Sequence, residues 1–332
     1  MAEVAVIGAG SWGTALAGAL ADMGHGVRLW AREEEVVASI REEGRNRLFL
    51  PDVVLPAAVR ATSSLEEAIG PAGIVLTVMP SHVCRALYER MLPLLGAGQV
   101  LVSATKGLEQ ATLMRMSEVI GEVLRSRFTP RIAVLSGPSF AREVARGEPT
   151  ALVAASGCPE VAERIQREFS SRTLRLYASE DVVGVELGGA VKNVIAIAAG
   201  VIEGLGLGHN PMAALVTRGL AEISRLAAAC GGKQETLAGL AGMGDLVLTC
   251  TGAQSRNRGV GVELGKGRTL GDILGPMREV AEGVKTTEAV LELSRRLGVD
   301  MPIATMVGRL LRGAIGPREA IGELMERSLK SE

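Results

Sequence analysis

The chain has few aromatic residues and almost no net charge. Phe, Trp and Tyr make up 2% of its 332 residues, and 36 Lys and Arg are balanced by 37 Asp and Glu. Nucleic-acid-binding proteins present basic surfaces and aromatic side chains that stack on bases, so we expect no nucleic-acid partner. Apolar runs also fall short of the roughly 20 residues that a bilayer span needs, so no membrane span is expected.

Cysteines are also scarce. Cys84, Cys158, Cys230 and Cys250 form no Cys-x-x-Cys pair, and no histidine lies at a zinc-binding spacing from them. This pattern predicts neither disulfides nor a metal site. The apolar N-terminus carries Glu3 in place of the basic residues that begin a secretory signal. We therefore expect a cytoplasmic protein.

Glycine, in contrast, is abundant, with 42 residues, and three glycines follow the first apolar run. Residues 4–7 predict a buried strand, and Gly8, Gly10 and Gly13 then form a G-x-G-x-x-G turn before a helix predicted over 14–23. Between a strand and a helix, this spacing indicates dinucleotide binding. The first glycine would allow the tight turn, the second the approach of the pyrophosphate, and the third close helix–strand packing. The helix N-terminus would face the phosphates.

Three later apolar runs, at 74–78, 100–103 and 132–135, also predict strands. In an open α/β sheet, ligands bind beyond the carboxyl ends of the strands, so the loops after these runs should meet at one crevice with the glycine turn. A Pro-Ser or Gly-Pro pair alone is more often ordinary turn chemistry. The loops begin with Met79-Pro80-Ser81, Ala104-Thr105-Lys106-Gly107 and Ser136-Gly137-Pro138-Ser139.

The strand pattern stops at about residue 183, and the remaining sequence is typical of helices. We predict an α/β protein in two domains. A Rossmann-type doubly wound sheet would occupy residues 1–183, and an all-helical domain would occupy residues 184–332 and hold the substrate.

Lys192 lies in the most apolar helical stretch, residues 187–202. A helix without a polar face is buried, and burial of an ammonium group lowers its pKa toward the range of an acid/base catalyst. A lysine that extends its head group to the surface is the common alternative. Because Gly188 and Gly189 leave room for a neighbouring backbone or a ligand, we favour a catalytic lysine.

Two loops of the second half carry further polar groups. Asp245 follows the glycines of Ala241-Gly-Met-Gly, and Ser255, Arg256 and Asn257 place a hydroxyl, a guanidinium and an amide together. The latter set suits a phosphate monoester. Taken singly, Asp245 would more often be a helix cap and Arg256 a solvated surface charge.

Together these segments resemble the bacterial NAD(P)-dependent glycerol-3-phosphate dehydrogenases. The matching stretches keep the family order over nearly the whole chain, with a departure at Met79, where the family usually has valine. They are GAGSWGTALA, MPSH, ATKGLE, SGPSFAREV, VELGGAVKNVIAIAAGV, TRGLAE, GMGDLVLTC, QSRNRGVG and VAEGVKT.

The resemblance implies reduction of dihydroxyacetone phosphate to sn-glycerol 3-phosphate by NADPH or NADH, without a metal, to supply phospholipid synthesis. It makes Lys192 the proton donor, with Asp245 orienting it and Lys106 lying between cofactor and substrate and lowering the pKa of Lys192. It also implies a homodimer. The substrate contacts would be Lys106, Gly137, Ser139, Lys192, Asp245, Ser255, Arg256 and Asn257, and the cofactor contacts Ser11, Trp12, Arg32, Lys106, Ala141, Arg256, Val280 and Glu282.

The residue after the second predicted strand, 27–30, bears on the choice of cofactor. NAD-specific Rossmann domains place an acidic residue there, whereas this chain has Ala31 and Arg32, with Glu33 only afterwards. An arginine binds a 2′-phosphate by charge-assisted hydrogen bonds, so we expect NADPH to be favoured and NADH accepted. If Arg32 instead only stacks on the adenine, the two cofactors would be nearly equal.

Two other functions share parts of this pattern. One is a β-hydroxyacid dehydrogenase, which also pairs a Rossmann domain with a helical domain and a helix-borne lysine. The other is a non-catalytic NAD(P)-sensing module. The phosphate-binding set and Asp245 argue against the first, and two lysines with an aspartate near the nicotinamide end argue against the second.

Overall fold

A computed structural model of the protein describes residues 1–277 and 281–329. Within these residues the strands form one eight-stranded sheet in the order β3-β2-β1-β4-β5-β6-β7-β8. All neighbouring strands are parallel except β6 and β7. The strands are Glu3–Ile7 (β1), Gly26–Trp30 (β2), Val59–Thr62 (β3), Ile74–Thr77 (β4), Val100–Ser103 (β5), Arg131–Ser136 (β6), Thr150–Ala155 (β7) and Leu174–Ser179 (β8).

The first six strands have the Rossmann order, with the chain crossing from the β3 edge to β4 beside β1. The carboxyl ends of β1, β4, β5 and β6 therefore lie at the same edge of the sheet, as predicted. Lys106, after β5, reaches the carbonyl of Gly137, after β6, at 3.0 Å. The strands β3, β7 and β8 were not predicted, and β7 and β8 run antiparallel to the other six.

Helices cover both faces of the sheet, which makes it doubly wound. Alternate residues of β1 enter two separate apolar clusters: Val4 and Val6 pack with α1, α2 and α7, and Ala5 and Ile7 pack with α3, α4 and α5. The helices of this part are Ser11–Asp22 (α1), Glu34–Glu43 (α2), Leu65–Ile69 (α3), Cys84–Met91 (α4), Met116–Leu124 (α5), Ala141–Ala145 (α6) and Pro159–Phe169 (α7), with short 3₁₀ turns at Ser81–Val83 (η1) and Leu92–Leu94 (η2).

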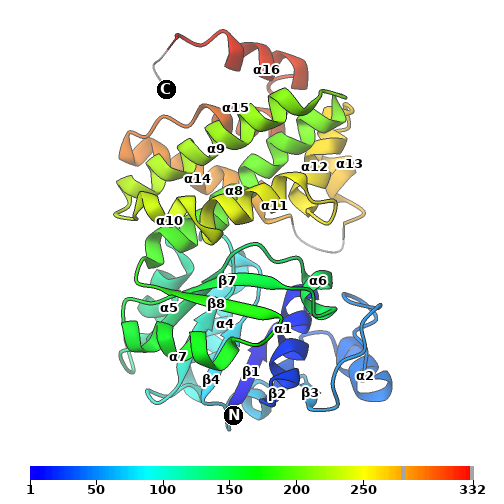
Figure 1. Cartoon of the computed structure of the whole chain (residues 1–332), viewed down its shortest axis with the longest axis vertical. Coiled ribbons are helices and arrows are strands. Elements are labelled where there is room, and N and C mark those ends of the chain that lie inside the picture. The colour runs from blue at the N-terminus through cyan, green and yellow to red at the C-terminus, as the bar shows by residue number, and fades with distance from the viewer. Residues whose placement is uncertain (278–280, 330–332) are drawn as a thin grey trace.

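The remaining chain is helical and stands above the sheet in Figure 1, with α16 farthest from it. Its central helix, α8, packs against α9, α11, α12, α14 and α15. These elements are Val182–Gly204 (α8), His209–Ala229 (α9), Gln234–Ala238 (α10), the π-helical turn Leu240–Gly244 (η3), Asp245–Thr251 (α11), Arg256–Gly265 (α12), Leu270–Leu274 (α13), Glu282–Leu297 (α14), Pro302–Leu311 (α15) and Pro317–Met325 (α16).

We expected no apolar stretch long enough to span a membrane, and the helix α8 shows that this expectation was wrong. With 23 residues it is long and apolar enough to cross a membrane by length and composition, and it is the only such helix in the described part of the chain. However, 94% of its most apolar window is buried inside the protein. A core helix passes the same test, and this burial is what a core helix requires.

The fold class is as predicted, while element ends differ by a few residues. The first helix begins at Ser11, three residues before the predicted start at Thr14. The last strand ends at Ser179 and α8 begins at Val182, so strands give way to helices close to the predicted boundary at 183. The division into two domains stays a prediction.

Candidate active site

The glycine turn after β1 has the local geometry that its spacing predicts. Gly8 has φ +116°, and a Cβ there would lie 2.1 Å from the carbonyl oxygen of Val78. A Cβ on Gly13 would lie 1.8 Å from the carbonyl oxygen of Gly8, so α1 can pack closely only with glycine there. In contrast, a Cβ on Gly10 would meet nothing within 4 Å. This open side, at the N-terminus of α1, fits the approach of a pyrophosphate.

Lys192 is buried in α8, with 5% of its surface exposed. Its Nζ lies 2.8 Å from Oδ1 of Asp245 and donates a hydrogen bond of 2.6 Å to Oγ1 of Thr249. A Cβ on Gly188 would lie 2.5 Å from the carbonyl oxygen of Ala241, so a second backbone segment does approach α8. The lysine therefore does not extend to the surface, because its ammonium group is held by an internal carboxylate.

Asp245 joins this lysine to a second one. Its other oxygen, Oδ2, lies 2.7 Å from Nζ of Lys106, and the carboxylate is 2% exposed. Nζ of Lys106 also donates to the carbonyl of Gly137 at 3.0 Å, and Oγ of Ser139 donates to the same carbonyl at 3.0 Å. The structure thus brings together five predicted site residues from four separate segments. The carboxylate bridges two lysines and does not cap α11.

The environment of Lys192 favours its neutral form. The pKa of Lys192 is lowered to about 8, chiefly by burial; Asp245 opposes this shift, and the positive charge of Lys106 adds to it. The predicted effect of Lys106 has the right sign, but burial is the larger cause. An amine with a pKa near neutrality can both donate and accept a proton at physiological pH.

The three residues of the predicted phosphate clamp lie where α12 begins. Arg256 is the first residue of α12, and Oγ of Ser255 accepts a backbone hydrogen bond of 3.2 Å from the first turn of that helix. Nδ2 of Asn257 donates to Oδ1 of Asn193 at 3.0 Å, and its Oδ1 accepts from a backbone N–H of α14 at 2.9 Å. Asn257 therefore contacts the residue that follows Lys192 in α8.

Glu282, a predicted cofactor contact at the start of α14, reaches across to a loop of the sheet. Its Oε2 accepts a hydrogen bond of 2.7 Å from Oγ of Ser81, in the loop after β4. Burial raises the pKa of Glu282, and the charge of Arg256 is among the influences that lower it. These two predicted cofactor residues therefore lie within electrostatic reach of each other.

The other predicted cofactor residues surround α1 and the end of β2. Ser11 and Trp12 form the first turn of α1, and Trp12 and Ala141 pack against the same small apolar cluster. Arg32 follows β2, is exposed, and forms an ion pair of 2.6 Å with Glu33. Val280 lies outside the described residues.

Three residues that contact this site were given no role from the sequence, although Ser81 was expected in a loop at the crevice. Thr249 lies four positions after Asp245 on one helix, so its place on the same face was a usable signal. Asn193 is adjacent to Lys192, but nothing in the sequence pairs it with Asn257. No pattern links Ser81 to α14, because the two segments meet only through the packing of the domains.

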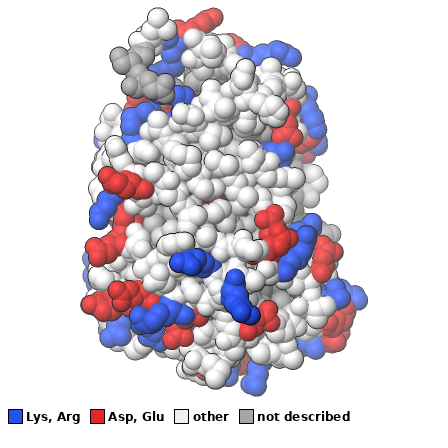
Figure 2. Space-filling view, in the orientation of Figure 1, with Lys and Arg blue, Asp and Glu red and all other residues white. Residues whose placement is uncertain are grey.

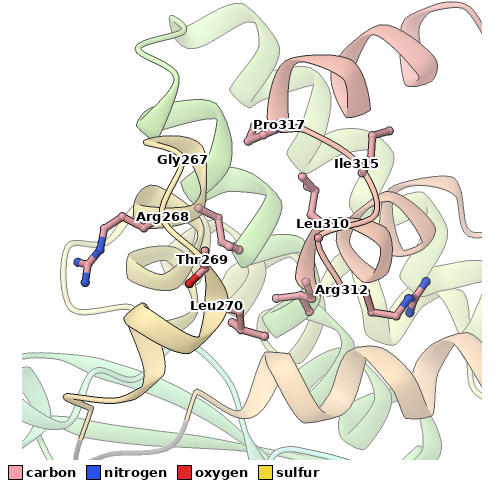
Figure 3. A pocket seen from close by; sticks show the side chains of 11 residues that line it. Gly267, Arg268, Thr269, Leu270, Leu310, Arg312, Ile315 and Pro317 are labelled. Carbon is pink, nitrogen blue, oxygen red and sulfur yellow. The ribbon is translucent and has the colours of Figure 1, made fainter.

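A cavity of about 350 Å³ lies elsewhere, between the α12–α13 turn and the α15–α16 turn. Figure 3 shows that the guanidinium groups of Arg268 and Arg312 point away from it, toward the outside. Arg268 is paired with Glu263 at 2.9 Å. The lining that remains is mainly aliphatic and contains no member of the lysine–aspartate cluster.

These features define a class of protein. A doubly wound sheet with a glycine turn at its switch point, facing a buried lysine–aspartate pair from a helical domain, is typical of NAD(P)-dependent dehydrogenases. In residues 1–277 and 281–329 no group of three or more His, Cys, Asp or Glu side chains could hold a metal ion.

Comparison with known proteins narrows the class to one family. Residues 3–162 match the family model described as NAD-dependent glycerol-3-phosphate dehydrogenase N-terminus, and residues 181–322 match the corresponding C-terminus. The chain belongs to the NAD-dependent glycerol-3-phosphate dehydrogenase family. This confirms the family that the sequence motifs resemble.

Individual relatives are similar to this chain along nearly its whole length. A glycerol-3-phosphate dehydrogenase of the NAD(P)+ type from Koribacter versatilis is 59% identical, with 100% of this chain and 99% of the relative covered. One from Geobacter sulfurreducens is 55% identical, with 99% and 98% covered. The crystal structure of glycerol-3-phosphate dehydrogenase from Coxiella burnetii matches with a TM-score of 0.93 at 41% identity, covering 98% of this chain and 99% of that one.

Proposed function

We propose that the protein catalyses the NAD(P)-dependent reduction of dihydroxyacetone phosphate to sn-glycerol 3-phosphate, and the reverse reaction. The observation that carries this proposal is the Lys106–Asp245–Lys192 cluster, in which Asp245 and Lys192 are buried and both ion pairs are shorter than 3 Å, at the edge of the sheet where the glycine turn lies. The names of the most similar relatives support the choice of substrate.

The bound nicotinamide supplies or accepts the hydride. Nζ of Lys192 donates a proton to the carbonyl oxygen during reduction and accepts it back during oxidation. Asp245 and Thr249 fix the direction of this Nζ, since both lie within 2.8 Å of it. Lys106, held between Asp245 and the carbonyl of Gly137, adds positive charge that stabilises the developing oxyanion.

The phosphate of the substrate is assigned to Ser255, Arg256 and Asn257, with Gly137 and Ser139 on the opposite side. Ser255 accepts a hydrogen bond through its oxygen, so its own O–H remains a donor for a phosphate oxygen. The amide of Asn257 uses one N–H toward Asn193 and keeps a second. The guanidinium of Arg256 supplies the charge and the paired hydrogen bonds.

For the cofactor we propose NADPH in preference to NADH, with no metal taking part. The contacts assigned to it are Gly8, Gly10, Ser11, Trp12, Gly13, Arg32, Lys106, Ala141, Arg256, Val280 and Glu282. The preference rests on Arg32 and is moderated by Glu33, because the bound 2′-phosphate must replace this carboxylate as the partner of the guanidinium.

We also propose a homodimer that works in the cytoplasm and supplies glycerol 3-phosphate to phospholipid synthesis. Most of the face over the helical elements is free of Lys, Arg, Asp and Glu in Figure 2. Met243 and Val247, on η3 and α11, are each 41% exposed, which supports an interface on this part of the molecule. Sedimentation velocity tests the dimer. The proposed domains keep the boundary between residues 183 and 184.

The test of the activity is the consumption of NADPH, followed by absorbance, with dihydroxyacetone phosphate as substrate. Unphosphorylated dihydroxyacetone should be a very poor substrate, because contacts to the remote phosphate position the carbonyl. A 3-hydroxyacid and its keto acid should not react. Turnover of the keto acid without turnover of dihydroxyacetone phosphate would show that the substrate assignment is wrong.

A further inference from the structure

Asn46 lies in the segment between α2 and β3, in none of the motifs considered above, and is fully buried. Its Nδ2 donates hydrogen bonds of 2.8 Å to the carbonyl oxygen of Ala9 and to Oγ1 of Thr14, and its Oδ1 accepts one of 3.1 Å from the N–H of Phe49. The orientation of the amide is chemically determined, because a carbonyl only accepts and a backbone N–H only donates. A buried amide with these partners is held in one position.

One of these partners belongs to the glycine turn. Ala9 lies between Gly8 and Gly10, and its carbonyl also receives a 3.3 Å hydrogen bond from Oγ1 of Thr14. In a trans peptide the C=O and the following N–H point in opposite directions, and the described peptide bonds include no cis bond. With the carbonyl of Ala9 held inward, the N–H of Gly10 points outward, on the turn whose outer side is open.

We propose that Asn46 is a positioning residue for the dinucleotide: it holds the Ala9–Gly10 peptide so that the N–H of Gly10 is presented to the pyrophosphate. This inference rests on the proposed function, since it assumes that the glycine turn binds the nicotinamide cofactor. Asn46 acts on the cofactor only through the peptide, because its side chain lies beneath the turn and is closed off from solvent.

A purely structural role for Asn46 is the competing explanation. Its carbonyl accepts from the N–H of Leu50, and Leu50 packs against Ala15 of α1, so the segment also covers this helix. Ser39 provides a matched control. Its Oγ donates to the carbonyl of Arg45 at 2.9 Å and so holds the same segment, without any contact to the glycine turn.

The experiment compares Asn46→Ala with Ser39→Ala and the wild type by calorimetric titration with NADPH and by steady-state kinetics. For Asn46→Ala we expect the Kd and the KM for NADPH to rise about tenfold, the loss of one well-placed hydrogen bond. The KM for dihydroxyacetone phosphate and the kcat at saturating NADPH should change less than twofold. Ser39→Ala should bind NADPH as the wild type does.

Three outcomes would overturn the reasoning. Wild-type affinity in folded Asn46→Ala, or an equal loss in Ser39→Ala, would show that the amide does not position the turn. Failure of the wild type itself to bind NADPH or NADH would instead refute the proposed cofactor site. If Asn46→Ala does not fold, Asn46→Ser carries the test, because its hydroxyl ends one bond short of the position of Nδ2; a several-fold loss of NADPH affinity is expected, and wild-type affinity would contradict the proposal.

Discussion

Replacing Lys192 by alanine removes the proposed proton donor while leaving its surroundings largely intact. Asp245 keeps the ammonium group of Lys106 at 2.7 Å, so the buried carboxylate retains a counter-charge and the chain should still fold. Loss of a positioned acid/base group lowers the rate by about 10²- to 10⁴-fold. We therefore expect Lys192→Ala to lower kcat at least a hundredfold, which corresponds to about 2.7 kcal/mol in the activation free energy.

The assay is NADPH consumption with dihydroxyacetone phosphate, combined with calorimetric titration of NADPH alone. NADPH affinity should stay within about twofold of the wild type, because the proposed role of Lys192 is at the substrate carbonyl and not at the pyrophosphate turn. Lys266→Ala is the matched control, since this lysine of the same domain has an exposed ammonium paired with Glu263 at 2.8 Å. A near-normal kcat in Lys192→Ala would refute the role of this lysine.

The pH dependence supplies an independent check on the same residue. Burial lowers the pKa of Lys192 to about 8. Reduction requires the protonated amine, so kcat/KM for dihydroxyacetone phosphate should fall as the pH rises through about 8. Oxidation requires the neutral amine, so kcat/KM for glycerol 3-phosphate should rise over the same range. The residual activity of Lys192→Ala should lack this transition. If the pH profile of the variant is unchanged, the transition near pH 8 belongs to another group.

Three further substitutions test other parts of the site and the fold. Arg256→Lys should raise the KM for dihydroxyacetone phosphate about tenfold or more, because an ammonium cannot replace the paired hydrogen bonds of a guanidinium; unchanged kinetics would place the phosphate elsewhere. Arg32→Ala should lower the ratio of kcat/KM for NADPH to that for NADH about tenfold, and Glu33→Gln should raise it; a wild-type preference for NADH would contradict this assignment. Arg115→Met removes the cation 2.8 Å from buried Glu186 and should lower the free energy of unfolding by about 3 kcal/mol in urea titrations, and a loss below about 1 kcal/mol would show that the pair is dispensable.

Two of the strands that were not predicted, β3 and β8, have weak sequence signals. The segment of β3 is only Val59–Thr62 and contains the exposed Arg60, and β8 alternates buried Leu174 and Leu176 with exposed Arg175 and Tyr177. Both strands lie at the edges of the sheet, where one side is not covered by a neighbouring strand. The antiparallel direction of β7 depends on how its neighbours pair, which no local pattern encodes.

The glycine turn and the burial of Lys192 could be predicted from the sequence, because each depends only on residues nearby in the chain. The glycine turn joins a strand to the helix that follows it, so the spacing of Gly8, Gly10 and Gly13 was enough to predict its geometry. Likewise the apolar run around Lys192 was enough to predict its burial and the downward shift of its pKa. The family motifs further indicated which loops carry site residues and in what order these loops occur along the chain.

The tertiary structure alone decided which of these groups touch. Lys106, Lys192 and Asp245 come from distant segments, and only the packing of α8 against η3 and α11, beside the loop after β5, brings their charges to 2.7 and 2.8 Å. The contact of Asn46 also depends on tertiary packing, because the loop after α2 brings its amide to the carbonyl of Ala9 in the glycine turn. The sequence by itself determined the strand–turn–helix unit and the types of residue available for chemistry, because these depend on neighbours along the chain. The hydrogen bonds and ion pairs of the site depend on long-range packing, which is why only the folded structure decided them.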